Sequence, residues 1–187
     1  MFSDKIAIEV ACNRSKFVYR ARGARIQDSH TIRRRGFSIK VMFWGAITSE
    51  GPGPLVPIEG TVNAERYITI LNDNALPLLQ NDNRIFQHDN ARSHTASRTS
   101  DFLANNNVSV FPWPPYLPDM NLIENVWSLL KQKVNETTTR SRSDFISKAQ
   151  TVWTTDNDVA QMCRNIYNSM PNRITALIIA KGGYTGY

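Results

Sequence analysis

Two carboxylates in the middle of the chain, Asp89 and Glu124, have the side-chain chemistry and the surroundings of metal ligands. Asp89 follows the apolar-to-polar run 85–88, and Glu124 follows a proline-rich stretch at 112–118. Mg²⁺ prefers hard oxygen ligands and takes only one or two protein carboxylates, and two-metal phosphoryl transfer places a few carboxylates around the ions. The alternative is that Asp89 starts a turn and Glu124 is a solvated glutamate that favours the helix dipole.

The elements around these carboxylates are predicted from local composition. Runs 85–88 and 108–111 are β-prone. The prolines at 112–118 exclude a helix or a central strand, because proline lacks the amide donor. A helix is predicted from about Leu122 to Val134, with the segment 119–121 (Asp, Met, Asn) able to cap it. Asp89 is therefore expected at a strand tip and Glu124 in the first turn of a helix.

One face of that predicted helix is apolar. At i, i+4, i+7 and i+11 spacing it carries Ile123, Trp127, Leu130 and Val134. Glu124 lies about 100° from Ile123 on the helical wheel. It can therefore flank the buried stripe and face Asp89 along the sheet edge.

Three motifs resemble those of the Tc1/mariner transposases. Residues 87–96 read QHDNARSHTA and are similar to the second-aspartate motif of that family, and residues 113–127 read WPPYLPDMNLIENVW and are similar to its glutamate motif. The 34 residues between Asp89 and Glu124 match the Tc1-like pattern of two aspartates and a glutamate. The start, FSDK at 2–5, resembles the first-aspartate motif, with Asp4 as the third carboxylate.

This resemblance implies a fold and a domain organisation. The fold would be α/β and ribonuclease-H-like, with a five-stranded mixed sheet flanked by helices on both faces. The chain, 1–187, would be a single DDE catalytic domain that ends in helices over about 144–180. Helix-turn-helix DNA-binding modules would lie upstream, and only three residues precede Asp4. We therefore expect an N-terminally truncated domain with weak, sequence-indifferent DNA binding.

The resemblance also implies the chemistry. Asp4, Asp89 and Glu124 would hold two Mg²⁺ or Mn²⁺ ions for strand cleavage and strand transfer in cut-and-paste transposition. The partners would be transposon ends and target DNA in the nucleus, and a homodimer in the transposition complex stays open. The polar neighbours expected to support the carboxylates are His88, Asn90, His94 and Asn121.

Three departures from the family pattern leave a second interpretation open. Lys5 stands where the family usually has glutamate, and Leu117 and Leu122 stand where it often has serine and proline. A cation beside a metal site changes its electrostatics directly. The alternative function is a decayed or co-opted transposase fragment that binds nucleic acid without catalysis.

The basic charge is concentrated near the N-terminus. Of 22 Lys/Arg and 16 Asp/Glu, residues 1–40 hold ten basic and three acidic side chains. Such a segment favours phosphate contacts, which give affinity without reading sequence. Arg33, Arg34, Arg35 and Lys40 are the predicted DNA-binding residues; the alternative is a solvated loop.

The remaining elements are predicted from apolar periodicity. Strands are expected at 6–10, 16–20, 38–48 and, at an edge after a break at 51–54, 55–58; helices are expected at 64–79, 95–104, 144–154 and 158–180, the last interrupted at Pro171. No apolar run reaches the roughly 20 residues that a bilayer requires, so no membrane partner is expected. The two cysteines, Cys12 and Cys163, form no metal-ligand spacing and are typical of a reduced, intracellular chain.

Overall fold

The computed structural model describes residues 1–10, 38–81, 84–114, 120–136 and 139–183. The predicted strand at 16–20 and the predicted DNA-binding residues Arg33, Arg34 and Arg35 lie outside these ranges. Within them, no helix is long and apolar enough to cross a membrane.

A three-stranded antiparallel sheet forms the centre of the molecule. Its strands are β1 (Phe2–Val10), β2 (Ile39–Ile47) and β3 (Pro52–Ile58), in the order β1-β2-β3. β2 is the central strand, as its apolar run predicts, and its last five residues are all buried. The predicted break after β2 covered residues 51–54, but β3 begins at Pro52. The prediction is therefore wrong for residues 52–54. An edge strand tolerates prolines because one side of its backbone needs no ladder partner.

Two further segments extend the sheet by single bridges. Phe2 pairs in parallel with Gln87, and Phe86 pairs in parallel with Val110. Backbone bonds accompany these bridges, including Ser3 N–H to the Gln87 carbonyl at 3.0 Å. The described residues thus form a mixed arrangement of three strands and two bridged segments, and the five-stranded sheet stays a prediction.

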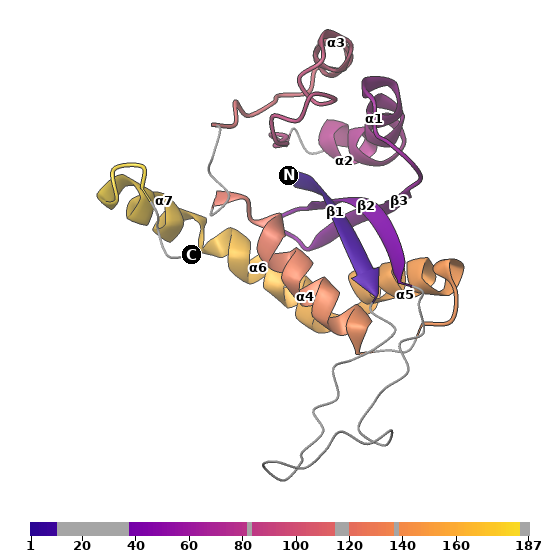
Figure 1. Cartoon of the computed structure of the whole chain (residues 1–187). Coiled ribbons are helices and arrows are strands. Elements are labelled where there is room, and N and C mark those ends of the chain that lie inside the picture. The colour runs from indigo at the N-terminus through magenta and orange to yellow at the C-terminus, as the bar shows by residue number, and fades with distance from the viewer. Residues whose placement is uncertain (11–37, 82–83, 115–119, 137–138, 184–187) are drawn as a thin grey trace, which may run out of the picture.

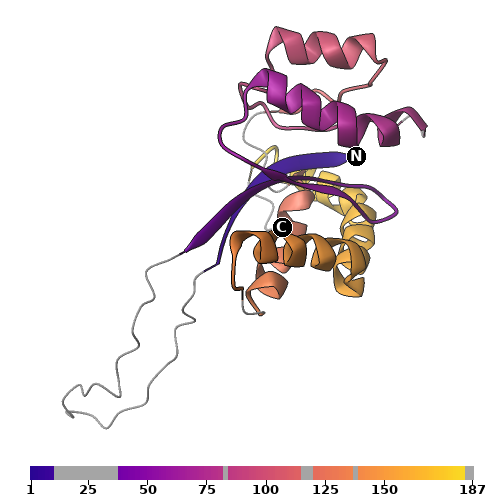
Figure 2. The same ribbon diagram turned by 90° about the vertical axis from the view of Figure 1, so that its right-hand side faces the viewer.

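Helices cover both faces of the sheet (Figures 1 and 2). One face carries the helix α1 (Ala64–Ile70), η2 (Leu71–Ala75) and α2 (Leu76–Asn81), with α3 (Ser97–Asn105) beyond it; the other carries α4 (Ile123–Asn135), α5 (Arg142–Thr155) and α6 (Asn157–Asn168), followed by α7 (Met170–Ile179). Two hydrophobic cores result. Alternate residues of each strand point to opposite faces of the sheet. Ile6 and Ile8 of β1 pack toward α4, α5 and α6. Trp44 and Ala46 of β2 pack toward α1.

Local sequence explains the helix boundaries. Asn63 caps α1, because its Oδ1 accepts a hydrogen bond from the Arg66 N–H at 2.9 Å. The π-helical turn η2 ends at Ala75, two residues before Pro77, which has no N–H to donate within the helix. Asn107 adopts a positive φ of 56° after α3, as expected for an asparagine that ends a helix. The break in the predicted helix 158–180 falls at Ser169, ahead of Pro171, because proline fits the first turn of α7.

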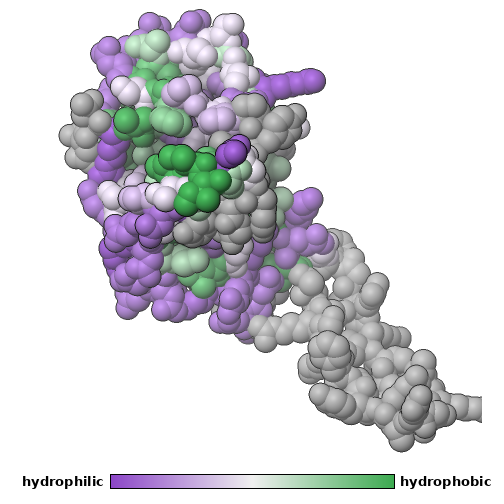
Figure 3. Space-filling model, turned by 90° about the vertical axis from the view of Figure 1, so that its left-hand side faces the viewer, coloured by the Kyte–Doolittle hydropathy of each residue, from purple (hydrophilic) through white to green (hydrophobic). Residues whose placement is uncertain are grey.

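Apolar side chains also reach the surface on the side where α7 lies (Figure 3). The exposed large apolar residues include Ile85, Phe111, Ile174, Ile178 and Ile179. Ile85, Phe111 and Ile174 line one pocket, so this apolar surface extends from the bridged segments to α7.

Candidate functional site

Asp4 lies inside β1 and faces the α4 side of the sheet. It pairs with Gly45 of β2 and occupies the same face as Ile6 and Ile8. Its Oδ1 accepts a hydrogen bond from the Lys5 backbone N–H at 2.6 Å. β1 thus begins four residues before the predicted strand 6–10 and includes Asp4.

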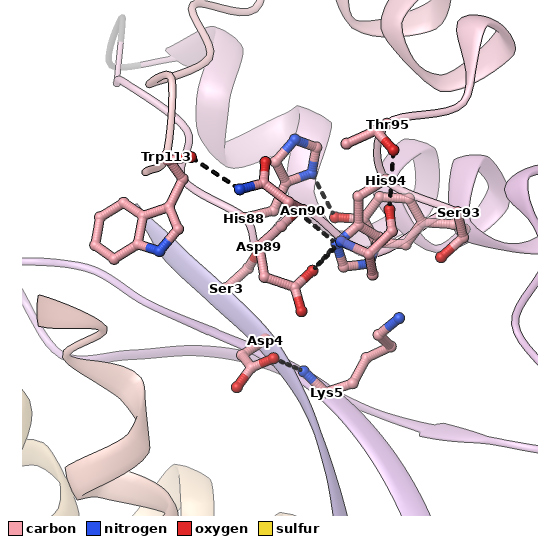
Figure 4. A network of polar contacts seen from close by, with 12 residues as sticks. Ser3, Asp4, Lys5, His88, Asp89, Asn90, Ser93, His94, Thr95 and Trp113 are labelled. Carbon is pink, nitrogen blue, oxygen red and sulfur yellow. Dashed lines mark hydrogen bonds and ion pairs between the residues drawn. The ribbon is translucent and has the colours of Figure 1, made fainter. Parts of the chain in front are cut away.

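Asp89 follows the bridged segment that pairs with β1. Its carboxylate accepts a hydrogen bond from the Ala91 N–H at 3.1 Å and forms an ion-pair contact with the Nδ1 of His94. The same nitrogen lies 3.2 Å from the Asp89 backbone oxygen. An imidazole nitrogen that faces two oxygens must carry the proton, so His94 donates from Nδ1. Figure 4 shows Asp89 between His94 and the strand that carries Asp4.

Glu124 lies in the first turn of α4, as predicted, and is exposed. Its backbone N–H donates to the Asn121 carbonyl at 3.1 Å. The N-cap residue is Leu122, which forms no side-chain cap, and the buried Asn121 Oδ1 has no hydrogen-bond partner among the described atoms. The predicted capping role of the Asn121 side chain is therefore wrong: the backbone of Asn121 closes the turn, and Asp119 lies outside the described ranges.

The pKa of Asp4 responds to both other carboxylates. It is raised to about 6, mainly by burial; the hydrogen bond from the Lys5 N–H lowers it, and the negative charges of Asp89 and Glu124 raise it. The Trp127 indole N–H also lowers the pKa of Asp4, without meeting full hydrogen-bond geometry. Like charges act this way at short range, and a bound cation would relieve them.

Asp89 has the opposite behaviour. The hydrogen bond from His94 lowers the pKa of Asp89 to about 2, against partial burial, which raises it. Lys5 also lowers the pKa of Asp89 through its positive charge, so the cation that replaces the family's usual glutamate acts on the site. Asp89 is therefore ionised at pH 7.

Two histidines and a tyrosine form a stack behind Asp89. The rings of Tyr67 and His94 lie 4.0 Å apart, those of His88 and His94 5.1 Å apart, and the Tyr67 hydroxyl lies 3.0 Å from His88 Nδ1. Burial, with the nearby His94, lowers the pKa of His88 to about 4. His88 is therefore neutral at pH 7. The supporting role of His88 and His94 stays a prediction. Tyr67 was missed because its helix lies far from the motifs in sequence.

Asn90 connects the Asp89 turn to the loop that leads toward Glu124. Its side-chain amide donates to the Trp113 carbonyl at 2.9 Å, as Figure 4 shows. The predicted DNA-binding residue Lys40 lies elsewhere: it is exposed on β2 opposite Glu9, five register positions from the Asp4–Gly45 pair. At about 3.4 Å per residue this is roughly 17 Å from Asp4.

The carboxylates of Asp4, Asp89 and Glu124 are suitable ligands for a hard divalent cation, although they do not surround one point closely. Carboxylate oxygens are the ligands that Mg²⁺ and Mn²⁺ prefer. In the described part of the chain, no three His, Cys, Asp or Glu side chains are grouped tightly enough to hold a metal ion. Asp4 and Asp89 instead accept hydrogen bonds from the protein, and Asp4 carries the repulsion that a cation would remove.

Known proteins are similar to this chain in sequence. A family model described as DDE superfamily endonuclease matches residues 1–146. The Tcb1 transposase of Caenorhabditis briggsae is 28% identical over 160 residues, and the Tc1 transposase of Caenorhabditis elegans is 28% identical over 179 residues. These alignments cover 84% and 92% of this chain but 57% and 64% of the relatives, so the chain spans less than two thirds of their length.

Solved structures of Mos1 transposase share the fold. The paired-end complex with the left transposon end superposes with a TM-score of 0.80 at 23% identity, over 98% of this chain and 55% of that one. The Mos1 catalytic domain with raltegravir and Mg gives 0.67 at 24% identity, over 78% and 77%. The mixed α/β fold is therefore similar to that of the Mos1 transposase catalytic domain.

Proposed function

The chain belongs to the DDE superfamily endonuclease family, as a Tc1/mariner catalytic domain, and we propose on that premise that it performs metal-dependent phosphoryl transfer on DNA. The observation that carries the proposal is the parallel pairing of Phe2 with Gln87, which brings Asp4 and Asp89, each two residues further along, close together. Glu124 of α4 lies near enough for its charge to raise the pKa of Asp4. Strand cleavage and strand transfer in cut-and-paste transposition are the proposed reactions.

We propose that Asp4, Asp89 and Glu124 hold two divalent ions. When bound, such ions activate an attacking oxygen and stabilise the leaving oxygen. Mos1 structures containing Mg or Mn support the choice of metal. The protein's own groups then orient the ligands: His94 and the Ala91 N–H fix one Asp89 carboxylate oxygen, and the Lys5 N–H fixes one Asp4 oxygen.

The proposed partners are transposon ends and target DNA, in the nucleus and within a complex that includes a second transposase copy. Mos1 structures contain paired transposon ends or a strand-transfer complex, which supports a DNA partner here.

We also propose that segments 85–88 and 108–111 form the fourth and fifth strands of the sheet. This arrangement would place Asp89 beside Asp4.

One observation favours a second candidate, nucleic-acid binding without catalysis. Lys5 places a positive charge close enough to lower the pKa of both Asp89 and His88. A fixed cation there opposes divalent ions and attracts a phosphate.

A nicking assay distinguishes the two candidates. Supercoiled plasmid is incubated with Mn²⁺ and either the parent protein or Asp89→Asn, and DNA binding is followed in parallel by gel shift. The proposed function predicts open-circle product from the parent alone. Equal nicking by both proteins would contradict it, and binding without nicking by the parent would establish the second candidate.

A further inference from the structure

Gly45 has no room for a side chain. A Cβ built on Gly45 would lie 2.4 Å from Cη2 of Trp127 and 3.2 Å from Cδ1 of Leu55. Real Cβ atoms do not approach other heavy atoms as closely as the first of these separations. Gly45 does not have a positive φ, so sterics rather than backbone conformation require glycine here.

The missing side chain is on the same face of the sheet as the Asp4 carboxylate. Asp4 and Gly45 are direct partners in the antiparallel β1–β2 ladder, and directly paired residues project to the same face. The indole of Trp127 therefore lies over the sheet immediately beside Asp4, in the space that a Gly45 side chain would fill.

Trp127 belongs to the same helix as Glu124 and lies three residues after it. Residues at i and i+3 are neighbours on a helix surface. The depth at which the Trp127 ring sits on β2 therefore determines how close the first turn of α4, with Glu124, comes to Asp4.

Other contacts leave the Trp127 ring little freedom to move aside. It is 3% exposed and stacks on Trp153 with ring centroids 5.0 Å apart. Trp153 is held in turn by a hydrogen bond from its Nε1 to the Gly53 carbonyl at 2.7 Å. Because protein interiors are close-packed, a methyl group added at position 45 would push α4 and β2 apart.

We infer that Gly45 is a positioning residue that sets the distance between the carboxylates of Asp4 and Glu124. That Gly45 sets this distance rests on geometry alone. That the distance affects metal affinity rests on the proposed function. A role in core packing without effect on the site is the competing explanation.

The test compares Gly45→Ala, Trp127→Phe and the double variant. Phenylalanine lacks the outer indole ring that carries Cη2, so it removes the atom that a residue-45 methyl group would strike. We expect Gly45→Ala to weaken Mn²⁺ binding, measured by calorimetry, by about tenfold or more, as for other residues that orient metal ligands. When Gly45→Ala is added to Trp127→Phe, we expect the Mn²⁺ affinity to change by less than about twofold.

A matched control separates positioning from stability. Leu103→Ala creates a cavity in the core on the opposite face of the sheet, so it destabilises the fold without touching α4. It should leave the Mn²⁺ affinity of the folded protein unchanged. Unchanged affinity in folded Gly45→Ala, or an equal loss when the change is made in the Trp127→Phe background, would overturn the inference. If Gly45→Ala does not fold, a loss of about tenfold on adding Gly45→Ala to Trp127→Phe still overturns the inference.

Failure of the proposed function gives a different result. If the parent itself binds no Mn²⁺, the metal proposal is wrong, and crystal structures of the metal-free parent and Gly45→Ala decide the inference. A larger separation between the Asp4 and Glu124 carboxyl groups in the variant supports it, and an unchanged separation refutes it.

Discussion

The side-chain amide of Asn90 donates a hydrogen bond to the backbone carbonyl of Trp113 at 2.9 Å. This bond joins the turn that carries Asp89 to the loop that precedes α4 and Glu124. Because the two segments are otherwise separate in sequence, the bond couples the positions of two proposed metal ligands.

Asn90→Ala should therefore affect metal binding more than stability. An exposed hydrogen bond contributes about 1 kcal/mol or less to the free energy of unfolding, so a small loss is expected in urea unfolding. Mn²⁺ affinity should fall several-fold, by analogy with about 10-fold effects of ligand-orienting groups. Asn105→Ala, on the exposed end of α3, is the control, and equal Mn²⁺ affinity in the two variants would refute the coupling.

Asp4→Asn should stabilise the metal-free protein while it removes a ligand. The pKa of Asp4 is raised to about 6 by burial and by its like-charged neighbours. Between about pH 4 and pH 6 the unfolded chain loses this proton while the folded protein keeps it, so stability falls as pH rises. At pH 7 the free energy of unfolding of Asp4→Asn should exceed that of the parent by about 2 kcal/mol, after allowance for solvent screening.

Urea unfolding of Asp4→Asn and the parent at pH 4 and pH 7 measures this effect. The difference between the two proteins should be small at pH 4 and large at pH 7. A constant difference across this range would show that Asp4 ionisation does not carry it.

The carboxylate motifs were readable from sequence because each lies within a short segment of characteristic residues. The helix at Glu124 and its buried stripe followed from periodicity, and Trp127, Leu130 and Val134 are all buried. Gly45 and Tyr67 could not be found this way. Gly45 matters because it contacts Trp127, which is 82 residues away in sequence. Tyr67 matters because it contacts His88 and His94, which are at least 21 residues away. No local sequence pattern indicates such contacts.

The edge strand and the sheet extension show the same limit. Prolines at 52 and 54 indicated a break, but the edge position of β3, which only the tertiary structure reveals, accommodates them. Segments 85–88 and 108–111 had strand composition, yet the described residues attach there through single bridges. Composition predicted which segments are extended. It could not predict how many of their residues pair, because that number depends on the neighbouring strand.

His94→Ala should raise the pKa of Asp89. The His94 hydrogen bond holds that pKa at about 2, and its stabilising contribution is present above about pH 4 and lost as pH falls toward 2. Carbon NMR titration of the Asp89 carboxyl group would measure the change. Thr95→Ala, in the same turn, serves as the control. If the pKa of Asp89 stays low in His94→Ala, another group stabilises the charged carboxylate.

Replacement of Arg33, Arg34 and Arg35 by alanine should weaken DNA binding without regard to sequence. For every DNA phosphate that the protein no longer neutralises, the slope of log affinity against log salt concentration should become shallower by about 0.9. Fluorescence anisotropy with unrelated duplexes measures the slope. A control protein with Lys131, Arg142 and Lys148 replaced by alanine has the same net charge; equal slopes in both would mean that only net charge matters.

Calorimetric titration of Mn²⁺ into the parent, Asp89→Asn and Glu124→Gln tests the central claim most directly. Both variants keep the size of the side chain and remove one anionic ligand. If the carboxylates form a divalent-metal site, the parent binds Mn²⁺ and each variant loses at least about tenfold in affinity, or about 1.4 kcal/mol. Binding by both variants at the affinity of the parent would contradict the assignment of Asp89 and Glu124 as metal ligands.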